Sequence, residues 1–192
     1  MSVSFLHARP RVTPRLFTAV LALYLVWYAL FFHGHLPFSL TALGEVVPGA
    51  LPLDLRFHYP ASDAITLLST LGEDGRQAYR RVLMADAVYP VLFALVQVLA
   101  NQLSVRALGR PGTLRTLVWL PAVPMLLDLL ENAGLWWLLG HPQPPAAVAA
   151  VVSVVTTAKH VTSLLALATC GVLALWAAVA RWRRFTSTRT GH

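Results

Sequence analysis

The chain has 192 residues, of which 57% are hydrophobic and only 12% are charged, and its formal net charge is +7. Soluble domains carry about 25% charged residues, whereas here the apolar residues gather in runs of roughly the 20 residues that cross a bilayer. The composition therefore excludes an ordinary soluble domain. Because the arginines flank the apolar runs, the positive charge indicates orientation in a membrane, and we expect contact with membrane lipids and none with nucleic acid.

Four apolar runs predict an all-α fold, a four-helix transmembrane bundle that forms one domain over residues 1–192. The first run covers about residues 16–32. Arginines precede it, as in a signal peptide, but it is long for a signal sequence and no cleavage site of small residues follows, which favours a retained helix. The other spans are expected at about residues 79–103, 116–139 and 146–180.

The outer segment, residues 33–78, is the one substantial stretch predicted outside the membrane. After Pro- and Gly-rich turns it contains "SDAITLLSTLGEDGRQAYRR". Ser62 is placed to cap a helix that buries Ile65 and Leu68 and ends at Gly72. We expect a short amphipathic helix at the outer interface that leads into the second span. Both a lid over the bundle and a plain connector fit this pattern.

The arginines also predict which side of the membrane each connection faces. Excess Lys and Arg marks the cytoplasmic side, and the turn between the third and fourth spans has neither. We therefore place both termini on the cytoplasmic side of a bacterial inner membrane. The residues behind this prediction are Arg9, Arg11 and Arg15 before span one, Arg106, Arg110 and Arg115 between spans two and three, and Arg181, Arg183, Arg184 and Arg189 in the tail.

Ionisable side chains inside the predicted spans are the main functional signal. Each costs roughly 2.5–3.5 kcal/mol near a bilayer centre, and Lys159 is the only lysine in the chain. At about 1.5 Å per helical residue, Asp86 lies roughly 10 Å from the outer surface and Glu131 slightly deeper, while Asp128 and Lys159 lie at about 18–20 Å. Three helices thus bring polar groups into one layer of the outer half of the bilayer.

Local spacing supports a shared site. Asp128, Glu131 and Asn132 follow the i, i+3, i+4 spacing of one helical face, and Pro121 and Pro124 permit a kink before it. A polar stripe on span four runs beside Lys159. The candidate catalytic residues are Asp128, Glu131, Lys159 and His160, and the candidate substrate-binding residues are Arg76, Asp86, Tyr89, Asn132 and Thr156.

The charges within this set predict a shared proton. Two close carboxyl groups do not both ionise cheaply, so we expect Asp128 or Glu131 to hold a proton near neutral pH. Such a proton suits acid–base chemistry and equally suits proton-coupled transport. The single Cys170 excludes a cysteine cluster, and no metal-ligand spacing, phosphate loop or dinucleotide motif is present. We expect neither a metal nor a cofactor.

Three segments together carry a resemblance: "LGEDGRQAYRRVLMADAVYP", "DLLENAG" and "TTAKH". The chain resembles small bacterial four-helix membrane proteins with the pattern G-x-x-G-R-x-x-Y, then D-x-x-Y-P, D-x-x-E-N and a Thr-x-Lys segment. The resemblance covers about residues 54–163 and implies a common fold and site, with no reaction attached. In topology alone the chain is also similar to the emopamil-binding (EXPERA) class, which includes sterol isomerases. The matching positions are Gly72, Gly75, Arg76, Tyr79, Asp86, Tyr89, Pro90, Asp128, Glu131, Asn132, Thr157 and Lys159.

Three functional hypotheses follow. In the leading hypothesis, the intramembrane site binds a lipophilic small molecule. It would also catalyse acid–base isomerisation or cyclisation of that molecule, with Asp128 and Glu131 as acid and base. In the second, the chain is a small proton-coupled transporter or channel subunit that works as a homo-oligomer. In the third, it is an accessory protein whose polar network serves helix assembly. Whether the chain is an enzyme stays open at this level.

Overall fold

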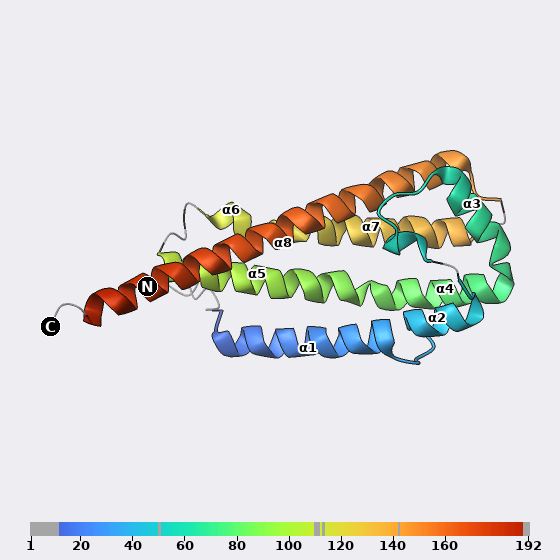
Figure 1. The fold of residues 1–192 in the computed structure, drawn as a ribbon. Helices are drawn as coiled ribbons and strands as arrows, with labels where there is room; N and C mark the ends of the chain where they lie inside the picture. The colour runs from blue at the N-terminus through green and yellow to red at the C-terminus, as the bar shows by residue number, and fades with distance from the viewer. Residues whose placement is uncertain (1–11, 50, 110–111, 113, 142, 190–192) are drawn as a thin grey trace, which may run out of the picture.

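The structure is a computed structural model that describes residues 12–49, 51–109, 112, 114–141 and 143–189, and every regular element in these residues is a helix (Figure 1). The predicted all-α fold is therefore confirmed. Three of the arginines that predict the orientation, Arg9, Arg11 and Arg110, lie outside the described residues.

Four stretches in the described part are helical, long and apolar enough to cross a membrane, as predicted. The helices that form them are α1 (Pro14–His33), α4 (Gly72–Asp86) with α5 (Val88–Leu108), α6 (Arg115–Val118) with α7 (Ala122–Leu139), and α8 (Ala146–Arg189).

Two of the helical stretches extend beyond the predicted spans. The second stretch begins at Gly72 rather than at residue 79, and α8 continues past residue 180. Hydropathy misses these helical turns because they are polar. Glu73 and Asp74 occupy the first turn of α4, where carboxylates interact favourably with the helix dipole.

The outer segment folds into three short helices: α2 (Leu40–Val46), the 3₁₀ turn η1 (Leu53–Leu55) and α3 (Ala61–Thr70). The expected helix is α3, and Leu68 is buried as predicted. The predicted cap was wrong, because Pro60 occupies the N-cap position and Ser62 lies inside the helix. Ala64 is the fully buried residue one turn before Leu68, while Ile65 is only partly buried.

Prolines interrupt two of the long stretches beside the future site. Pro90 has no backbone N–H to donate to the Asp86 carbonyl, and α4 gives way to α5 at Ala87 between them. Pro121 and Pro124 occupy the N-cap and the first turn of α7, where helical N–H groups have no intrahelical acceptor. The expected kink in the third span is a turn between α6 and α7.

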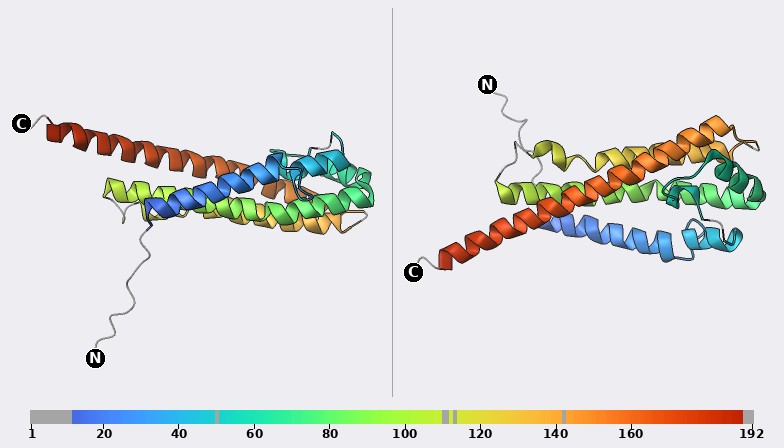
Figure 2. Two further views of the ribbon diagram at one scale, coloured as in Figure 1. Left: turned by 90° about the horizontal axis from the view of Figure 1, so that it is seen from below. Right: turned by 45° about the horizontal axis from the view of Figure 1, so that its top comes forward.

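The helices form an elongated body in which α5 is central (Figures 1 and 2). Helix α1 packs mainly on α5, while α7 and α8 pack on each other and on α5. Helix α8 crosses the others and extends beyond them at its C-terminal end; its 44 residues span about 66 Å. Close α7–α8 packing depends on Gly134, since a Cβ there would lie 2.7 Å from Val152 Cγ2.

Two apolar clusters hold the two ends of the molecule together. One lies near α3 and includes Leu68, Tyr79 and Leu135, and the other lies towards the far end and includes Val105 and Leu173. Between them, at the middle of the long helices, lie the buried charged residues. The apolar clusters thus leave a central layer in which polar side chains are concentrated.

Candidate functional site

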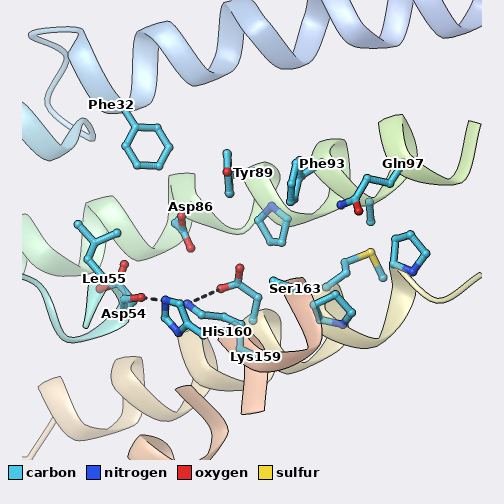
Figure 3. A pocket seen from close by; sticks show the side chains of 16 residues that line it. Phe32, Asp54, Leu55, Asp86, Tyr89, Phe93, Gln97, Lys159, His160 and Ser163 are labelled. Carbon is cyan, nitrogen blue, oxygen red and sulfur yellow. Dashed lines mark hydrogen bonds and ion pairs between the residues drawn. The ribbon is translucent and has the colours of Figure 1, made fainter. Parts of the chain in front are cut away.

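A cavity of about 230 Å³ occupies this central layer (Figure 3). It runs along α5 and is bordered by η1, by the start of α7 and by α8. Acidic and basic side chains lie towards η1, and mainly apolar side chains, together with Gln97 and Ser163, line the remainder. The lining residues are Phe32, Asp54, Leu55, Asp86, Tyr89, Pro90, Phe93, Ala94, Gln97, Pro121, Pro124, Met125, Asp128, Lys159, His160 and Ser163.

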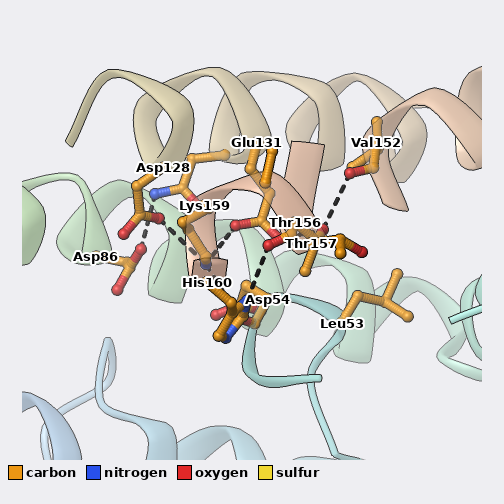
Figure 4. A network of polar contacts seen from close by, with 12 residues as sticks. Leu53, Asp54, Asp86, Asp128, Glu131, Val152, Thr156, Thr157, Lys159 and His160 are labelled. Atoms are coloured by element: carbon orange, nitrogen blue, oxygen red, sulfur yellow. Dashed lines mark hydrogen bonds and ion pairs between the residues drawn. The ribbon is translucent and has the colours of Figure 1, made fainter. Parts of the chain in front are cut away.

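Lys159 is at the centre of the polar network (Figure 4). Its side chain is 10% exposed and forms an ion pair with Glu131. The Nζ group also lies 3.4 Å from Asp128 Oδ1 and donates a hydrogen bond of 3.1 Å to the backbone carbonyl of Asp54. The lysine therefore joins α7 and α8 to the η1 segment.

Glu131 lies behind the lysine, away from the cavity. It is 0% exposed and is absent from the cavity lining. Its Oε1 accepts a hydrogen bond of 2.5 Å from Thr156 Oγ1, and the same Oγ1 lies 3.0 Å from the Val152 carbonyl within α8. With one oxygen facing Thr156 and the other facing Lys159, Glu131 fixes the lysine rather than reaching the cavity itself.

Two other acids, Asp86 and Asp128, face the cavity. Asp86 Oδ2 accepts a hydrogen bond of 2.7 Å from Asn132 Nδ2, which ties α4 to α7. Asp128 has Lys159 as its cationic partner and is 14% exposed. Figure 3 shows the Asp86 side chain directed from the α4–α5 joint towards the polar end of the cavity. Both carboxyl groups therefore lie in the interior of the bundle.

Asp54 is the main site residue that the sequence analysis missed. It lies in η1, is 4% exposed and lines the cavity. Tyr79 donates a hydrogen bond of 2.7 Å from its hydroxyl to Asp54 Oδ1 and accepts one of 2.8 Å from the Leu53 amide. The available signal was an acid between leucines in "PLDL", since a solvated loop seldom places one there.

The segment after η1 is joined to α8. The hydroxyl of Ser153 donates a hydrogen bond of 2.5 Å to the Tyr59 carbonyl, and the ring of Phe57 lies 5.6 Å from that of His160. Burial raises the pKa of Tyr59 to about 12, so this phenol keeps its proton. These contacts hold the segment after η1 against α8.

His160 lines the cavity with a defined proton position. Its Nδ1 lies 2.8 Å from the Thr156 carbonyl, which only accepts hydrogen bonds, so Nδ1 carries a proton. In the neutral ring Nε2 is then free to accept a proton, as a general base requires. Ser163, one turn further along α8, also lines the cavity.

Aromatic side chains form the wall between α1 and α5. Tyr89 lines the cavity and packs against Phe32 and Phe93 at centroid distances of 5.4 and 5.8 Å. Its hydroxyl lies 3.5 Å from that of Tyr24. This wall supplies an apolar aromatic surface beside the charged groups.

Arg76 lies apart from the other predicted site residues. Its guanidinium donates to the carbonyls of Leu139 and His141 at the end of α7 and to that of Leu68 in α3. It therefore satisfies helix-terminal carbonyls instead of lining the cavity. Five of the other predicted residues line the cavity: Asp86, Tyr89, Asp128, Lys159 and His160. The remaining three lie behind them, where Glu131 and Thr156 join the Lys159 network and Asn132 binds Asp86.

Among the described residues, no group of three or more His, Cys, Asp or Glu side chains is arranged to hold a metal ion. The chemistry that these residues themselves offer is proton exchange at carboxyl and imidazole groups and stabilisation of negative charge by an ammonium. Comparisons of the chain with protein-family models, with curated proteins and with solved structures found no match.

Proposed function

We propose that the four long apolar stretches cross a bilayer and that the central cavity binds a lipophilic small molecule. The observation that carries the proposal is the cavity itself, in which an apolar chamber ends at three carboxyl groups, an ammonium and an imidazole. A network that served only helix packing would fill this volume with side chains, because protein interiors leave few voids.

The orientation part of the proposal places both termini on the cytoplasmic side of a cell membrane. The start of α1 and the end of α8 lie at the same end of the molecule (Figure 1). At this end Arg106 also donates a hydrogen bond of 2.8 Å to the Val12 carbonyl. The arginine-rich segments gather there, as the positive-inside tendency requires. Helix α3 then lies at the outer interface, beside the polar end of the cavity.

The size of the cavity limits the ligand. Sites for drug-sized molecules measure roughly 300–1,000 Å³, whereas this one measures about 230 Å³. An acyclic or single-ring lipophile, or one end of a longer lipid, is the better match. The volume gives less support to the sterol-sized ligand that the topological likeness to the emopamil-binding class implies.

The second step of the proposal is acid–base catalysis on the bound molecule. In this proposal Asp128 and Nε2 of His160 exchange protons with the substrate, and Lys159 stabilises negative charge that develops between them. Asp86 orients the polar end of the substrate, and Glu131, Thr156 and Asn132 position the cavity-facing groups. The isomerisation of a double bond needs only an acid and a base, because one carbon gains a proton while another loses one.

Heavy water tests the catalytic step. The protein is placed in liposomes of host lipid extract in heavy water, and carbon-bound deuterium in each lipid component is measured by mass spectrometry. We expect one component to gain deuterium with the wild type and none with Asp128→Asn. If no component gains deuterium above the protein-free control, proton transfer is rejected and binding alone remains.

One observation favours transport as a second candidate. From Gln97 at the end of the cavity, a buried polar stripe continues along α5 through Asn101 and Ser104 towards the other end of the molecule. A proton path across the bilayer would use such a stripe. In this candidate the chain acts as a transporter or channel subunit within an oligomer. Proton flux into liposomes that Asn101→Leu abolishes would favour it, provided that no lipid component takes up deuterium in the heavy-water experiment.

A further inference from the structure

Gln97 is a buried amide at the cavity end remote from the charged cluster (Figure 3). It is 3% exposed, and its Oε1 has no hydrogen-bond partner within the described part of the chain. A buried polar group left unpaired costs about 1–3 kcal/mol. Its neighbours in the cavity lining are Phe93 and Ala94 on α5 and two prolines and a methionine on the first turn of α7.

The facing wall of α7 offers Gln97 no donor. Pro121 and Pro124 have no backbone N–H, and the side chain of Met125 has only a weakly accepting sulfur. If this position served packing alone, leucine would fit it better than glutamine, because leucine has no polar group that requires a partner. The amide therefore needs a partner that enters the cavity.

The position of Gln97 limits the length of that partner. Gln97 lies eleven residues after Asp86, which is about 16 Å along a helix. On α7, Pro121 lies seven residues before Asp128, or about 10 Å. The polar cluster and the amide thus stand at opposite ends of an apolar chamber roughly 10–16 Å long.

We propose that Gln97 recognises a second polar group of the ligand, at the end opposite the group held by Asp86, Asp128 and Lys159. An amide both donates and accepts, and its unpaired Oε1 needs a donor, so a hydroxyl group is the chemistry that fits. The ligand class is then a short lipophile with a hydrogen-bonding group at each end. This inference rests on the proposed lipophile-binding function and narrows it.

A buried water is the competing occupant. Asn101 lies one turn further along α5, is 0% exposed, and its Oδ1 also lacks a partner within the described residues. A water between the two amides would satisfy both oxygens without any ligand. Asn101 does not line the cavity and donates a hydrogen bond of 3.3 Å to the Leu117 carbonyl. It is therefore a matched control for removal of a buried amide.

The test is a competition between decanol, with one terminal hydroxyl, and decanediol, with a hydroxyl at each end. Wild type, Gln97→Leu and Asn101→Leu are incubated with an equimolar mixture in the same detergent, and the two bound masses are counted by native mass spectrometry. Comparing the diol-to-alcohol ratio between variants cancels the difference in how the two compounds partition into the detergent. Gln97→Leu removes a desolvated amide and keeps the volume of the side chain, so we expect it to fold.

We expect the diol-to-alcohol ratio to fall about two- to tenfold in Gln97→Leu, the value of one buried hydrogen bond, and to stay within about twofold of wild type in Asn101→Leu. Equal ratios in wild type and Gln97→Leu, with both compounds bound, would overturn the role of Gln97 and leave the proposed function intact. An equal fall of the ratio in Gln97→Leu and Asn101→Leu would indicate that both amides bind a buried water, and would also overturn the role of Gln97. Binding of neither compound to any form would contradict the proposed function itself.

Discussion

At the scale of single residues, the site depends on one lysine that serves several carbonyl and carboxylate oxygens. Lys159 contacts Glu131, Asp128 and the Asp54 carbonyl, which come from different parts of the chain. Charges taken out of water are tolerated when they are paired and hydrogen-bonded. Removal of the lysine alone would leave Glu131, which is 0% exposed, without its cation.

Lys159→Met is therefore expected to lower the free energy of unfolding by about 3–5 kcal/mol, the usual cost of leaving one member of a buried pair. The double variant Lys159→Met with Glu131→Gln should recover a large part of that loss, since no uncompensated charge then remains. Thermal unfolding of the four forms in one detergent gives this double-mutant cycle. Strictly additive losses would show that the two side chains are not coupled.

At the scale of secondary structure, the end of α7 is held by arginine side chains. Arg76 and Arg80 donate to the Leu139 carbonyl, which has no intrahelical partner at the end of α7. Because Arg76 also bonds α3, it connects the outer segment to the bundle. This role explains an arginine in the motif "GEDGR" without any contact with a ligand.

Arg76→Gln should lower stability by about 1–3 kcal/mol, as expected for hydrogen bonds from a charged donor, while the ligand bound per folded molecule stays unchanged. The exposed Arg81 supplies the control, since Arg81→Gln should alter neither quantity. Melting temperature and bound ligand are measured on the same samples. Loss of ligand without loss of stability would instead support the substrate-binding role predicted from sequence.

Gly134 sets the distance between α7 and α8. Gly134→Ala would place a Cβ against Val152, and overpacking of this kind costs about 1–3 kcal/mol. Gly171, on the exposed face of α8, has nothing within 4 Å of the position that a Cβ would occupy, so Gly171→Ala should be neutral or slightly stabilising. Unfolding of both variants is compared, and Val152→Ala should restore part of the loss at Gly134. Equal stability of the two glycine variants would contradict close packing at this point.

At the scale of the whole molecule, two apolar clusters enclose a polar middle, and the hydropathy pattern predicts this architecture well. Long apolar runs mark the helices because a bilayer requires about 20 such residues. The charges inside these runs predicted a shared layer, and Asp128, Glu131 and Lys159 meet there. Helix geometry alone was enough for this, since depth and face follow from residue number.

The residues that sequence did not reveal depend on tertiary contacts. Asp54 belongs to an irregular segment, whose position no helical period predicts, and it reaches the site because Tyr79 binds its carboxylate. Gln97 resembles any amide in a long helix until its neighbours are known. Arg76 was predicted to bind substrate, yet its guanidinium donates to carbonyls at the end of α7 and in α3. Periodicity identifies faces, whereas cavities and helix-end partners follow from the three-dimensional packing.

The proposed orientation makes a prediction for the whole chain. Fusions of green fluorescent protein to the amino terminus and to the carboxyl terminus should both fluoresce, because both termini are proposed to face the cytoplasm. Alkaline phosphatase inserted in the connection between α7 and α8 should be active outside. Fluorescence of only one terminal fusion would contradict an even number of crossings.

The most direct test of the central claim is mass spectrometry of small lipophilic molecules retained by the purified protein. Wild type, Asp128→Asn and Asp74→Asn are compared in one mild detergent. Asp128 lines the cavity and Asp74 is exposed on α4. We expect one defined compound in wild type and Asp74→Asn, and at least about a fivefold depletion in Asp128→Asn, equivalent to the loss of one buried hydrogen bond. Only bulk phospholipid in all three, with Asp128→Asn less stable, would contradict a ligand site and assign the polar network to helix assembly.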